Sequence, residues 1–320
     1  MEPHPLVSVI IPAYNVAEYV DAAIESALAQ TYPNIEVVVV NDGSTDDTAS
    51  VLARYESRIT LVTQENRGLA GARNAGLRVA KGAIIGLLDA DDMWFPHRVE
   101  RMIEALDASP DREIVTSDSY LMEDFTPTEK RSYPDRRRRP FPATEQDQIP
   151  EIARFNFLFI GVLFRRELIE RCGMFAEGAR RGANYEGDGT AERGLSIEGA
   201  EDYELWTRFL LSGTRVGFVD EPLGYYRVRA GSLSDAKKEQ GRAHLAVLER
   251  HLPELWRQGA RGYTRDVFAI ASSLAARGQR RAAATFFWHA LRAEEPQGSR
   301  FRQAVSSVRR LVRPSATWLE

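Results

Sequence analysis

The sequence predicts an α/β protein built on a parallel sheet, and two observations support this fold class. From residue 6 to residue 119, short β-branched runs alternate with longer stretches whose apolar residues recur at helical spacing. That alternation is typical of parallel strands joined by right-handed helical crossovers. The chain is 320 residues long and 43% hydrophobic, which is enough to bury the core that such a sheet needs.

Strands and helices are expected to follow one another in this first part of the chain. The predicted strands span residues 7–11, 35–40, 59–62, 84–88 and 113–117. The predicted helices span residues 15–32, 44–55, 69–80 and 96–106. The second strand is wholly apolar after Glu36, which indicates a strand inside the sheet. Asn15 with Glu18 forms a candidate capping box for the first helix, and Gly82 is a candidate left-handed C-cap for the third.

The later part of the chain is predicted to contain two long loops and a helical tail. Residues 123–148 are rich in proline and arginine, and residues 177–199 are rich in glycine and charge, so both are interpreted as loops. Between these loops regular secondary structure is predicted again, including a helix at 166–171. Beyond residue 234 the apolar spacing predicts helices at 237–251, 263–277, 279–293 and 300–312. We therefore predict a domain over residues 1–235, with halves meeting near residue 120, and a helical region over residues 236–320.

Composition excludes several classes of protein. A formal net charge of -4 argues against a nucleic-acid binder, and the single cysteine, Cys172, excludes an internal disulfide framework or a four-cysteine zinc site. No run of eighteen apolar residues occurs and no basic leader precedes the first strand, so a cytoplasmic, non-spanning protein is expected. An arginine-flanked apolar stripe at 301–312 could touch a membrane surface peripherally, although such a stripe more often packs on its own protein.

Three carboxylates, Asp89, Asp91 and Asp92, follow the fourth predicted strand. Ligands of parallel sheets bind just beyond the carboxyl ends of the strands. Crowded acids repel one another unless a positive charge lies between them, and a hard divalent cation is their natural partner. The segment therefore predicts a site for a metal and a diphosphate. The alternative is an acidic turn in which Asp91 or Asp92 caps the next helix.

The other predicted strands also end in groups suited to a nucleotide. Tyr14 follows the first strand and can stack on a base, whereas Asp42 follows the second and can accept the imide N–H of uracil. The alternative for Asp42 is a tight turn that leads into a helix cap. Arg73 and Asn74 lie near the start of the third helix, where a guanidinium could meet phosphate; the alternative is an exposed helical face.

These segments together resemble the successive motifs of glycosyltransferase family 2, in the same order and spacing. The matching segments are residues 9–15, 40–46, 66–68 with 72–74, 89–92, 201–206 and 226–232. The first reads Val-Ile-Ile-Pro-Ala-Tyr-Asn, the fourth reads Asp-Ala-Asp-Asp and the fifth begins Glu-Asp-Tyr. The resemblance extends to about residue 235.

The resemblance implies a glycosyltransferase A fold, a Rossmann-like mixed sheet flanked by helices, here with a C-terminal α-helical extension. It implies a nucleotide-diphosphate-sugar donor, a Mg or Mn ion bound through a DXD motif, and inversion at the anomeric carbon. Donor binding is assigned by resemblance to Pro12, Tyr14, Asn15, Asp42, Asn66, Arg73, Asp89, Ala90, Asp91 and Arg229. Asp91 or Asp92 is the implied metal ligand, with Asp91 favoured and the choice left open.

Asp202 is the implied general base, which removes the acceptor proton as the acceptor attacks. Glu201 could equally be the base, and the alternative is that both acids only cap their helix. The chain departs from many relatives at Arg229, where they carry histidine. Arginine cannot ligate a cation and would pair with phosphate directly, which leaves the third metal ligand in doubt. Residues 177–199 exceed the usual connection before Glu201 and are interpreted as a flexible acceptor lid.

The predicted reaction moves a sugar, from a UDP-sugar by preference because of Asp42, to a glycan, lipid-linked or other glycoconjugate acceptor. Thymine shares the imide edge of uracil, and guanine also stays open as the base of the donor. A homo-oligomeric state of the protein stays open as well. A nucleotidyltransferase would need a glycine-rich, lysine-bearing loop after the first strand, and a nicotinamide enzyme would need Gly-x-Gly-x-x-Gly; the chain has neither. The alternative outside these enzymes is a non-catalytic nucleotide-sugar-binding protein that interacts through its helical tail.

Overall fold

The structure is a computed structural model of the whole chain. It describes residues 4–133, 141–142, 145–154, 156–158, 161–177, 197 and 199–229, with scattered residues between 243 and 260. The chain divides into two compact units, residues 1–148 with 156–247, and residues 149–155 with 248–320. The predicted domain boundary after residue 235, the predicted helices beyond residue 262, the apolar stripe at 301–312 and most of the predicted lid lie outside the described residues. Within them, no helix has the length and apolar character needed to cross a bilayer.

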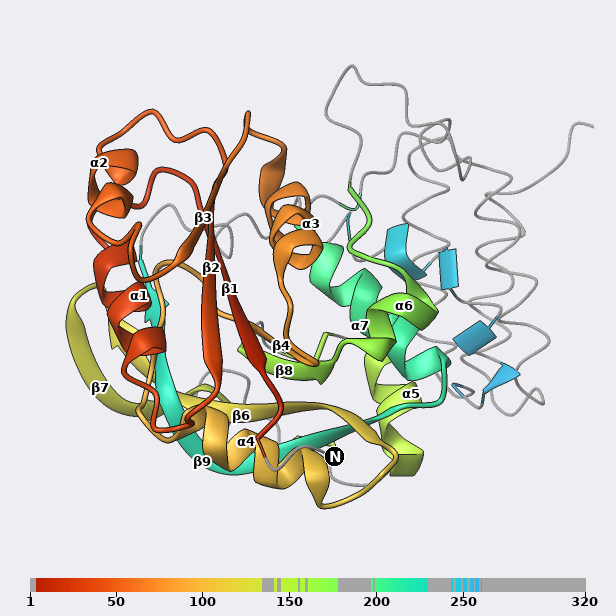
Figure 1. Cartoon of the computed structure of the whole chain (residues 1–320). Coiled ribbons are helices and arrows are strands. Elements are labelled where there is room, and N and C mark those ends of the chain that lie inside the picture. Colours follow the sequence, from red (N-terminus) through yellow and green to blue (C-terminus); the bar gives the residue numbers. More distant parts are fainter. Residues whose placement is uncertain are drawn as a thin grey trace, which may run out of the picture. The chain divides into compact units, whose positions relative to one another are not determined.

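A mixed sheet forms the centre of the first unit (Figure 1). In the described residues its order is β3-β2-β1-β4-β8-β6-β9-β5, and β7 pairs with β6. The strands are β1 (Val7–Ala13), β2 (Ile35–Asn41), β3 (Thr60–Thr63), β4 (Ile84–Leu87), β5 (Met93–Trp94), β6 (Arg112–Glu123), β7 (Thr126–Arg131), β8 (Val162–Arg165) and β9 (Arg215–Val228). Strands β1 to β4 are mutually parallel, whereas β8 runs antiparallel to its neighbours β4 and β6.

The order of the strands locates a ligand crevice. The chain moves outward from β1 to β2 and β3, then returns to place β4 on the other side of β1. Adjacent crossovers therefore leave in opposite directions from β1, and the carboxyl ends of β1 and β4 flank the crevice where open α/β sheets bind ligands. The segments that follow β1, β2 and β4 are the nucleotide and acidic motifs of the sequence.

Helices cover both faces of the parallel strands. Helices α1 (Val20–Leu28) and α3 (Gly68–Val79) pack on β1 and β2. The other described helices are α2 (Thr48–Ala53), α4 (Arg98–Asp107), α5 (Glu145–Arg154), α6 (Glu167–Cys172) and α7 (Glu201–Leu211). Side chains alternate across a strand, so the odd-numbered apolar residues of β1 pack with α1 and α4, whereas Ile10 faces α3. Figure 1 shows α1 and α3 on opposite sides of β1 and β2. The expectation that β2 lies inside the sheet is confirmed, because β1 and β3 flank it.

Two predicted helix caps are wrong. Helix α1 begins at Val20, and Asn15 has a positive φ of 51° and uses its Oδ1 to accept the N–H of Thr45 at 2.8 Å. Helix α3 ends at Val79 without a left-handed cap at Gly82. The reason for glycine at position 82 is close packing, because a Cβ there would lie 2.6 Å from the carbonyl oxygen of Leu6.

The segment predicted as a long loop at 123–148 contains regular structure where it is described. Strand β7 pairs antiparallel with β6, and α5 begins at Glu145. Strand β9 was not predicted, because Gly217, Pro222 and Gly224 interrupt the alternation that marks a strand. Its partner β6 is longer than the predicted 113–117, and the two strands pair with register shifts near Ser117. Strand β9 matters because its last residues reach the ligand crevice.

Replacing Gly224 by alanine should destabilise the fold by about 1–3 kcal/mol, the usual cost of overpacking. The new Cβ would collide with the backbone carbonyl oxygen of Met93 in β5, the strand that follows the acidic segment. Gly217→Ala in the same strand is the matched control, since a Cβ there meets its neighbours at 3.4 Å or more. Chemical denaturation should show a lower unfolding free energy for Gly224→Ala than for the control; equal values would contradict this packing.

Candidate active site

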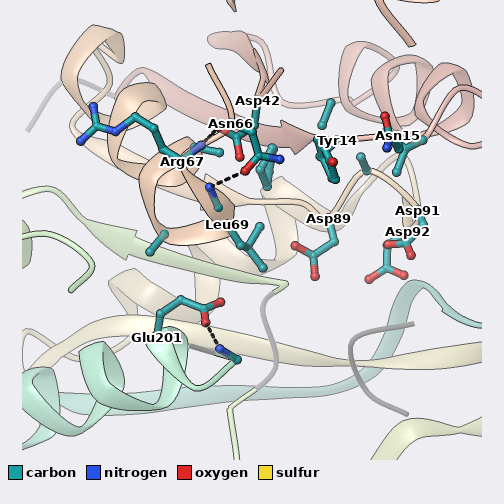
Figure 2. A pocket seen from close by; sticks show the side chains of 18 of the residues that line it. Tyr14, Asn15, Asp42, Asn66, Arg67, Leu69, Asp89, Asp91, Asp92 and Glu201 are labelled. Atoms are coloured by element: carbon teal, nitrogen blue, oxygen red, sulfur yellow. Dashed lines mark hydrogen bonds between the residues drawn. The ribbon is translucent and has the colours of Figure 1, made fainter. Parts of the chain in front are cut away.

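A cavity of about 550 Å³ opens at the carboxyl ends of β1, β2 and β4, a size suited to a small organic ligand. Its described lining brings together most of the predicted site residues: Pro12, Tyr14, Asn15, Asp42, Asn66, Asp89, Ala90, Asp91, Asp92, Glu201 and Arg229. Arg73 and Asp202 do not line it. The two ends of the cavity carry different chemistry, polar acceptors near Asp42 and a group of carboxylates near β4 (Figure 2).

Asp42 lies at one end of the cavity and is only 2% exposed. Its Oδ1 accepts the side-chain amide of Gln64 at 2.7 Å and the backbone N–H of Arg67 at 2.8 Å. Among the described residues, no hydrogen bond reaches its Oδ2. A buried carboxylate with one oxygen fixed and the other open can receive an N–H donor from a ligand, which is the role predicted for it.

Two loops are locked together beside Asp42. The N–H of Asn15 donates to Ser44 Oγ at 3.2 Å, and Val16 N donates to Thr48 Oγ1 at 2.9 Å. Tyr14 is 48% exposed as a residue and lines the cavity wall, where its ring can stack on a base. The left-handed backbone at Asn15 is thus part of a rigid loop rather than of a helix cap.

The carboxylates after β4 are held by two arginines, Arg227 in β9 and Arg229 directly after it. The Nε of Arg229 donates to Asp91 Oδ2 at 2.9 Å. The backbone N–H of Arg227 donates to Asp92 Oδ1 at 2.8 Å, and its Nε donates to the carbonyl of Asp91 at 2.6 Å. Removal from water, then repulsion by Asp91 and Asp89, raises the pKa of Asp92 well above its usual value. A further positive charge in this region would relieve that repulsion.

Arg73 lies behind the cavity lining and links residues from two of its walls, Asp89 and Glu201. It is 1% exposed, so the alternative of an exposed helical face is wrong. Its two terminal nitrogens donate to Glu201 Oε1 at 2.8 Å and to Asp89 Oδ1 at 3.0 Å. Figure 2 shows Glu201 and Asp89 directed into the cavity from α7 and from the end of β4.

Asp202 follows Glu201 in the first turn of α7, but within the described part of the chain no guanidinium hydrogen-bonds to it. Its Oδ2 accepts the amide of Asn156 at 3.0 Å, and its Oδ1 accepts the backbone N–H of Tyr203 at 2.6 Å. Burial raises the pKa of both Asp202 and Glu201, and the positive charge of Arg73 opposes that rise. A carboxylate with a raised pKa is a stronger base than one in water.

The acids fit a divalent cation in chemistry, since carboxylate oxygens are what Mg or Mn prefers and their mutual repulsion favours added positive charge. Their side chains are not already arranged as a metal site, because the described residues contain no group of three His, Cys, Asp or Glu side chains placed to hold a metal ion. Arg229 occupies one oxygen of Asp91. Asp91, with Asp92 as the alternative, could therefore hold such a cation together with oxygens of a bound diphosphate.

Sequence reasoning missed several residues of the site. Arg67 lines the cavity and binds Glu177 at 2.6 Å through its guanidinium, and Arg227 fixes Asp91 and Asp92 through the contacts above. Both sit inside the quoted motifs, so the motifs contained the signal. Asn156, the partner of Asp202, lies 46 positions earlier and has no local pattern that could reveal it.

Solved structures of similar fold include two that were determined with a nucleotide sugar bound. A mannosyltransferase of Pyrobaculum calidifontis, in complex with GDP-Man and Mn2+, aligns with a TM-score of 0.56 at 21% identity over 98% of this chain and 82% of its own. Staphylococcus aureus TarS 1-349 in complex with UDP-GlcNAc aligns with a TM-score of 0.56 at 18% identity, covering 95% and 92%. These likenesses confirm the predicted glycosyltransferase A fold.

Sequence relatives agree with the fold. A Rickettsia prowazekii protein named as an uncharacterized glycosyltransferase is 31% identical over 239 residues, which are 74% of this chain and 68% of the relative. The Escherichia coli UDP-Glc:alpha-D-GlcNAc-diphosphoundecaprenol beta-1,3-glucosyltransferase WfaP is 31% identical over 237 residues, 72% and 81% of the two chains. The family model described as glycosyl transferase family 2 matches residues 8–173. The chain therefore belongs to glycosyl transferase family 2 and is a glycosyltransferase.

Proposed function

We propose that this glycosyltransferase moves a sugar from a UDP-sugar to a glycan or lipid-linked glycoconjugate acceptor, with inversion at the anomeric carbon. The observation that carries the proposal is that one cavity presents the open oxygen of Asp42 at one end and the carboxylates of β4 and α7 at the other. The first suits a uracil imide, and the second suits a diphosphate with its cation and an attacking hydroxyl. The E. coli relative, whose name gives UDP-Glc as donor and a diphosphoundecaprenol-linked acceptor, supports the same substrate classes.

Asp202 is our proposed general base. The Oε1 of Glu201 accepts a hydrogen bond from Arg73, and its Oε2 accepts the backbone N–H of Gly199 at 3.1 Å. A guanidinium therefore pairs directly with the charge of Glu201. The direct hydrogen bonds of Asp202 come from neutral amides instead, which leaves its basicity less reduced. Asp202 lies outside the described lining of the cavity, so its side chain must turn toward the cavity to meet the acceptor. Glu201 is the alternative base.

A divalent cation is part of the proposal, with Asp91 as its protein ligand and Asp92 as the alternative. When bound, it would neutralise the charge that develops on the departing diphosphate. Asp89, Tyr14, Asn15 and Asn66 hold the remainder of the donor at the cavity wall. Arg229, ion-paired to Asp91, is in position to exchange that carboxylate for a donor phosphate.

Replacing Arg229 by glutamine should strengthen Mn binding about fivefold while weakening UDP binding in the absence of metal. The Arg229–Asp91 ion pair is partly exposed, and pairs of this kind contribute about 1 kcal/mol that a cation must overcome to use Asp91. Electron paramagnetic resonance titration of Mn without nucleotide measures the first effect, and calorimetry with UDP and EDTA measures the second. Asp91→Asn is the control and should weaken Mn binding. An unchanged Mn affinity in Arg229→Gln would contradict this competition.

Inversion can be tested without knowing the acceptor, because water can replace it in slow donor hydrolysis. A single in-line displacement on α-linked UDP-glucose releases β-glucose first. Proton NMR in the first minutes, before mutarotation, should therefore show the β-anomer in excess, and Asp202→Asn should abolish its release. Initial release of α-glucose would contradict an inverting mechanism.

A further inference from the structure

The buried guanidinium of Arg73 is used by neither the donor cavity nor the proton transfer described above. Its exposed fraction is 1%, and it does not line the cavity. It sits in the middle of α3 and pairs with carboxylates from two elements far apart in sequence, Asp89 after β4 and Glu201 at the start of α7. Its centre lies 5.4 Å from the ring of Phe175, and its Nε has no hydrogen-bond partner among the described residues.

We propose that Arg73 is a positioning residue of the transfer reaction, which ties the donor-facing Asp89 to the first turn of α7 and so holds the proposed base ready for the acceptor. The inference rests on the proposed function of the same site. It assigns to Arg73 a role different from the phosphate contact expected from its motif, because both terminal nitrogens of the guanidinium are already engaged. It also explains why a residue sealed from the cavity is placed between Asp89 and Glu201, which both line it.

The geometry makes Arg73 the direct link between these two walls. Glu201 is nearly as buried as Arg73, with 9% of its side chain exposed, whereas Asp89 keeps 27%. The exposed part of Asp89 faces the cavity, where the donor binds, and Figure 2 shows Glu201 reaching in from the other wall. A shift of Asp89 on donor binding would therefore be transmitted by the guanidinium to Glu201 and the neighbouring Asp202.

The charges around Arg73 show what its loss would do. Three carboxylates face it, Asp89 after β4 and Glu201 with Asp202 from α7, and it is the cation that most lowers the pKa of Glu201 and of Asp202. Burial raises the pKa of both α7 carboxyl groups, and repulsion by neighbouring carboxylates adds to that rise. Without Arg73, the carboxylates would hold their protons to higher pH. A base that must be ionised then loses activity sooner as the pH falls, so the acid limb of the pH profile moves upward.

The test is Arg73→Gln, with Arg73→Lys as a second variant in case the first folds poorly. We expect kcat for UDP release from the donor to fall about 10- to 100-fold in Arg73→Gln, with the acid limb of kcat/KM about one pH unit higher or more. Calorimetric UDP affinity should stay within about fivefold. Arg73→Lys keeps the positive charge but loses the two terminal nitrogens that bridge Asp89 and Glu201. The acid limb of this variant should therefore move less, while kcat still falls.

Arg98 is the matched control, because it is the second deeply buried arginine of the described core and forms no ion pair with a described carboxylate, although the charge of Asp92 acts on it from a distance. It is 2% exposed, and its NH1 donates to Ser117 Oγ at 2.8 Å while its NH2 donates to the carbonyl of Gly161. Arg98→Gln should lower the melting temperature as Arg73→Gln does, yet leave the acid limb in place. This control separates loss of packing from loss of positioning.

Two results would overturn the proposal. An unchanged acid limb in an Arg73→Gln protein that folds would show that Arg73 has a merely structural role. If the loss of activity came entirely from weaker UDP binding, Arg73 would instead be a phosphate contact. The double variant Arg73→Gln with Glu201→Gln should move the acid limb less than Arg73→Gln alone, because one repelling charge is gone. Failure of the proposed function itself would look different, since the wild-type protein would then neither bind UDP nor release it from any UDP-sugar.

Discussion

Asp202→Asn should reduce turnover by about two to four orders of magnitude while leaving donor affinity within a few-fold. The amide keeps the shape of the side chain and can still accept the N–H of Tyr203, but it cannot take a proton from the acceptor. Donor binding should survive, because Asp202 is outside the cavity lining and the residues that surround the donor are unchanged. UDP release from the donor and calorimetric titration with UDP measure the two quantities.

Glu201→Gln is the matched variant for this experiment. Its amide oxygen can still accept from Arg73, so the tie to α3 is weakened rather than lost. We expect a fall of about tenfold in turnover, because the variant disturbs the position of the base and not the base itself. The reverse order, with near-normal turnover in Asp202→Asn and a large loss in Glu201→Gln, would transfer the role of base to Glu201.

Asp42→Asn should weaken UDP binding by about 10- to 100-fold and change the preference between pyrimidines. In the wild-type protein the open Oδ2 of Asp42 can only accept, which suits the imide N–H of uracil. Gln64 and the N–H of Arg67 still require an acceptor at Oδ1, so the amide nitrogen of asparagine takes the open place. The hydrogen-bond donor of the asparagine amide would then face the N–H of the uracil imide, which is also a hydrogen-bond donor. A buried hydrogen-bond donor without an acceptor costs about 1–3 kcal/mol.

Cytosine provides the control for Asp42→Asn, because its N3 is an acceptor where that of uracil is a donor. CDP binding should hold steady or improve, so the ratio of UDP to CDP affinity should fall at least as much as UDP affinity itself. Gln64→Ala, which removes one donor to Oδ1 and leaves the carboxylate, should lower UDP affinity without changing the preference. A constant UDP to CDP ratio in Asp42→Asn would place the base elsewhere in the cavity.

The parts of the site that follow strands directly could be predicted from sequence. Tyr14, Asp42 and Asp91 each lie just beyond a parallel strand, so the topology alone brings them to one edge of the sheet. The predicted α/β class holds for the same reason, since the alternation over residues 6–119 is local. The mixed order of the sheet was implied only by the family resemblance, because antiparallel β8 is short and lies beyond the polar segment.

The rest depends on contacts between distant residues. Arg73 was placed on a helix correctly, but only the fold shows that it lies beneath the cavity and meets Glu201, 128 positions away. The capping box at Asn15 failed because its side chain binds Thr45 in the loop after β2, a partner that local pattern cannot supply. Strand β9 was missed because glycine and proline conceal its period, although it carries Arg227 and Arg229 to the acidic group.

The central claim, a uridine-diphosphate donor site formed by Asp42 and the carboxylates after β4, is tested most directly by calorimetry on the wild-type chain. UDP, dTDP, GDP and CDP would each be titrated with and without Mn. The account predicts that UDP binds, with dTDP following it because of the shared imide edge, that CDP binds at least tenfold more weakly, and that Mn strengthens binding. Binding of CDP as tightly as UDP, or of no nucleotide under either condition, would contradict it.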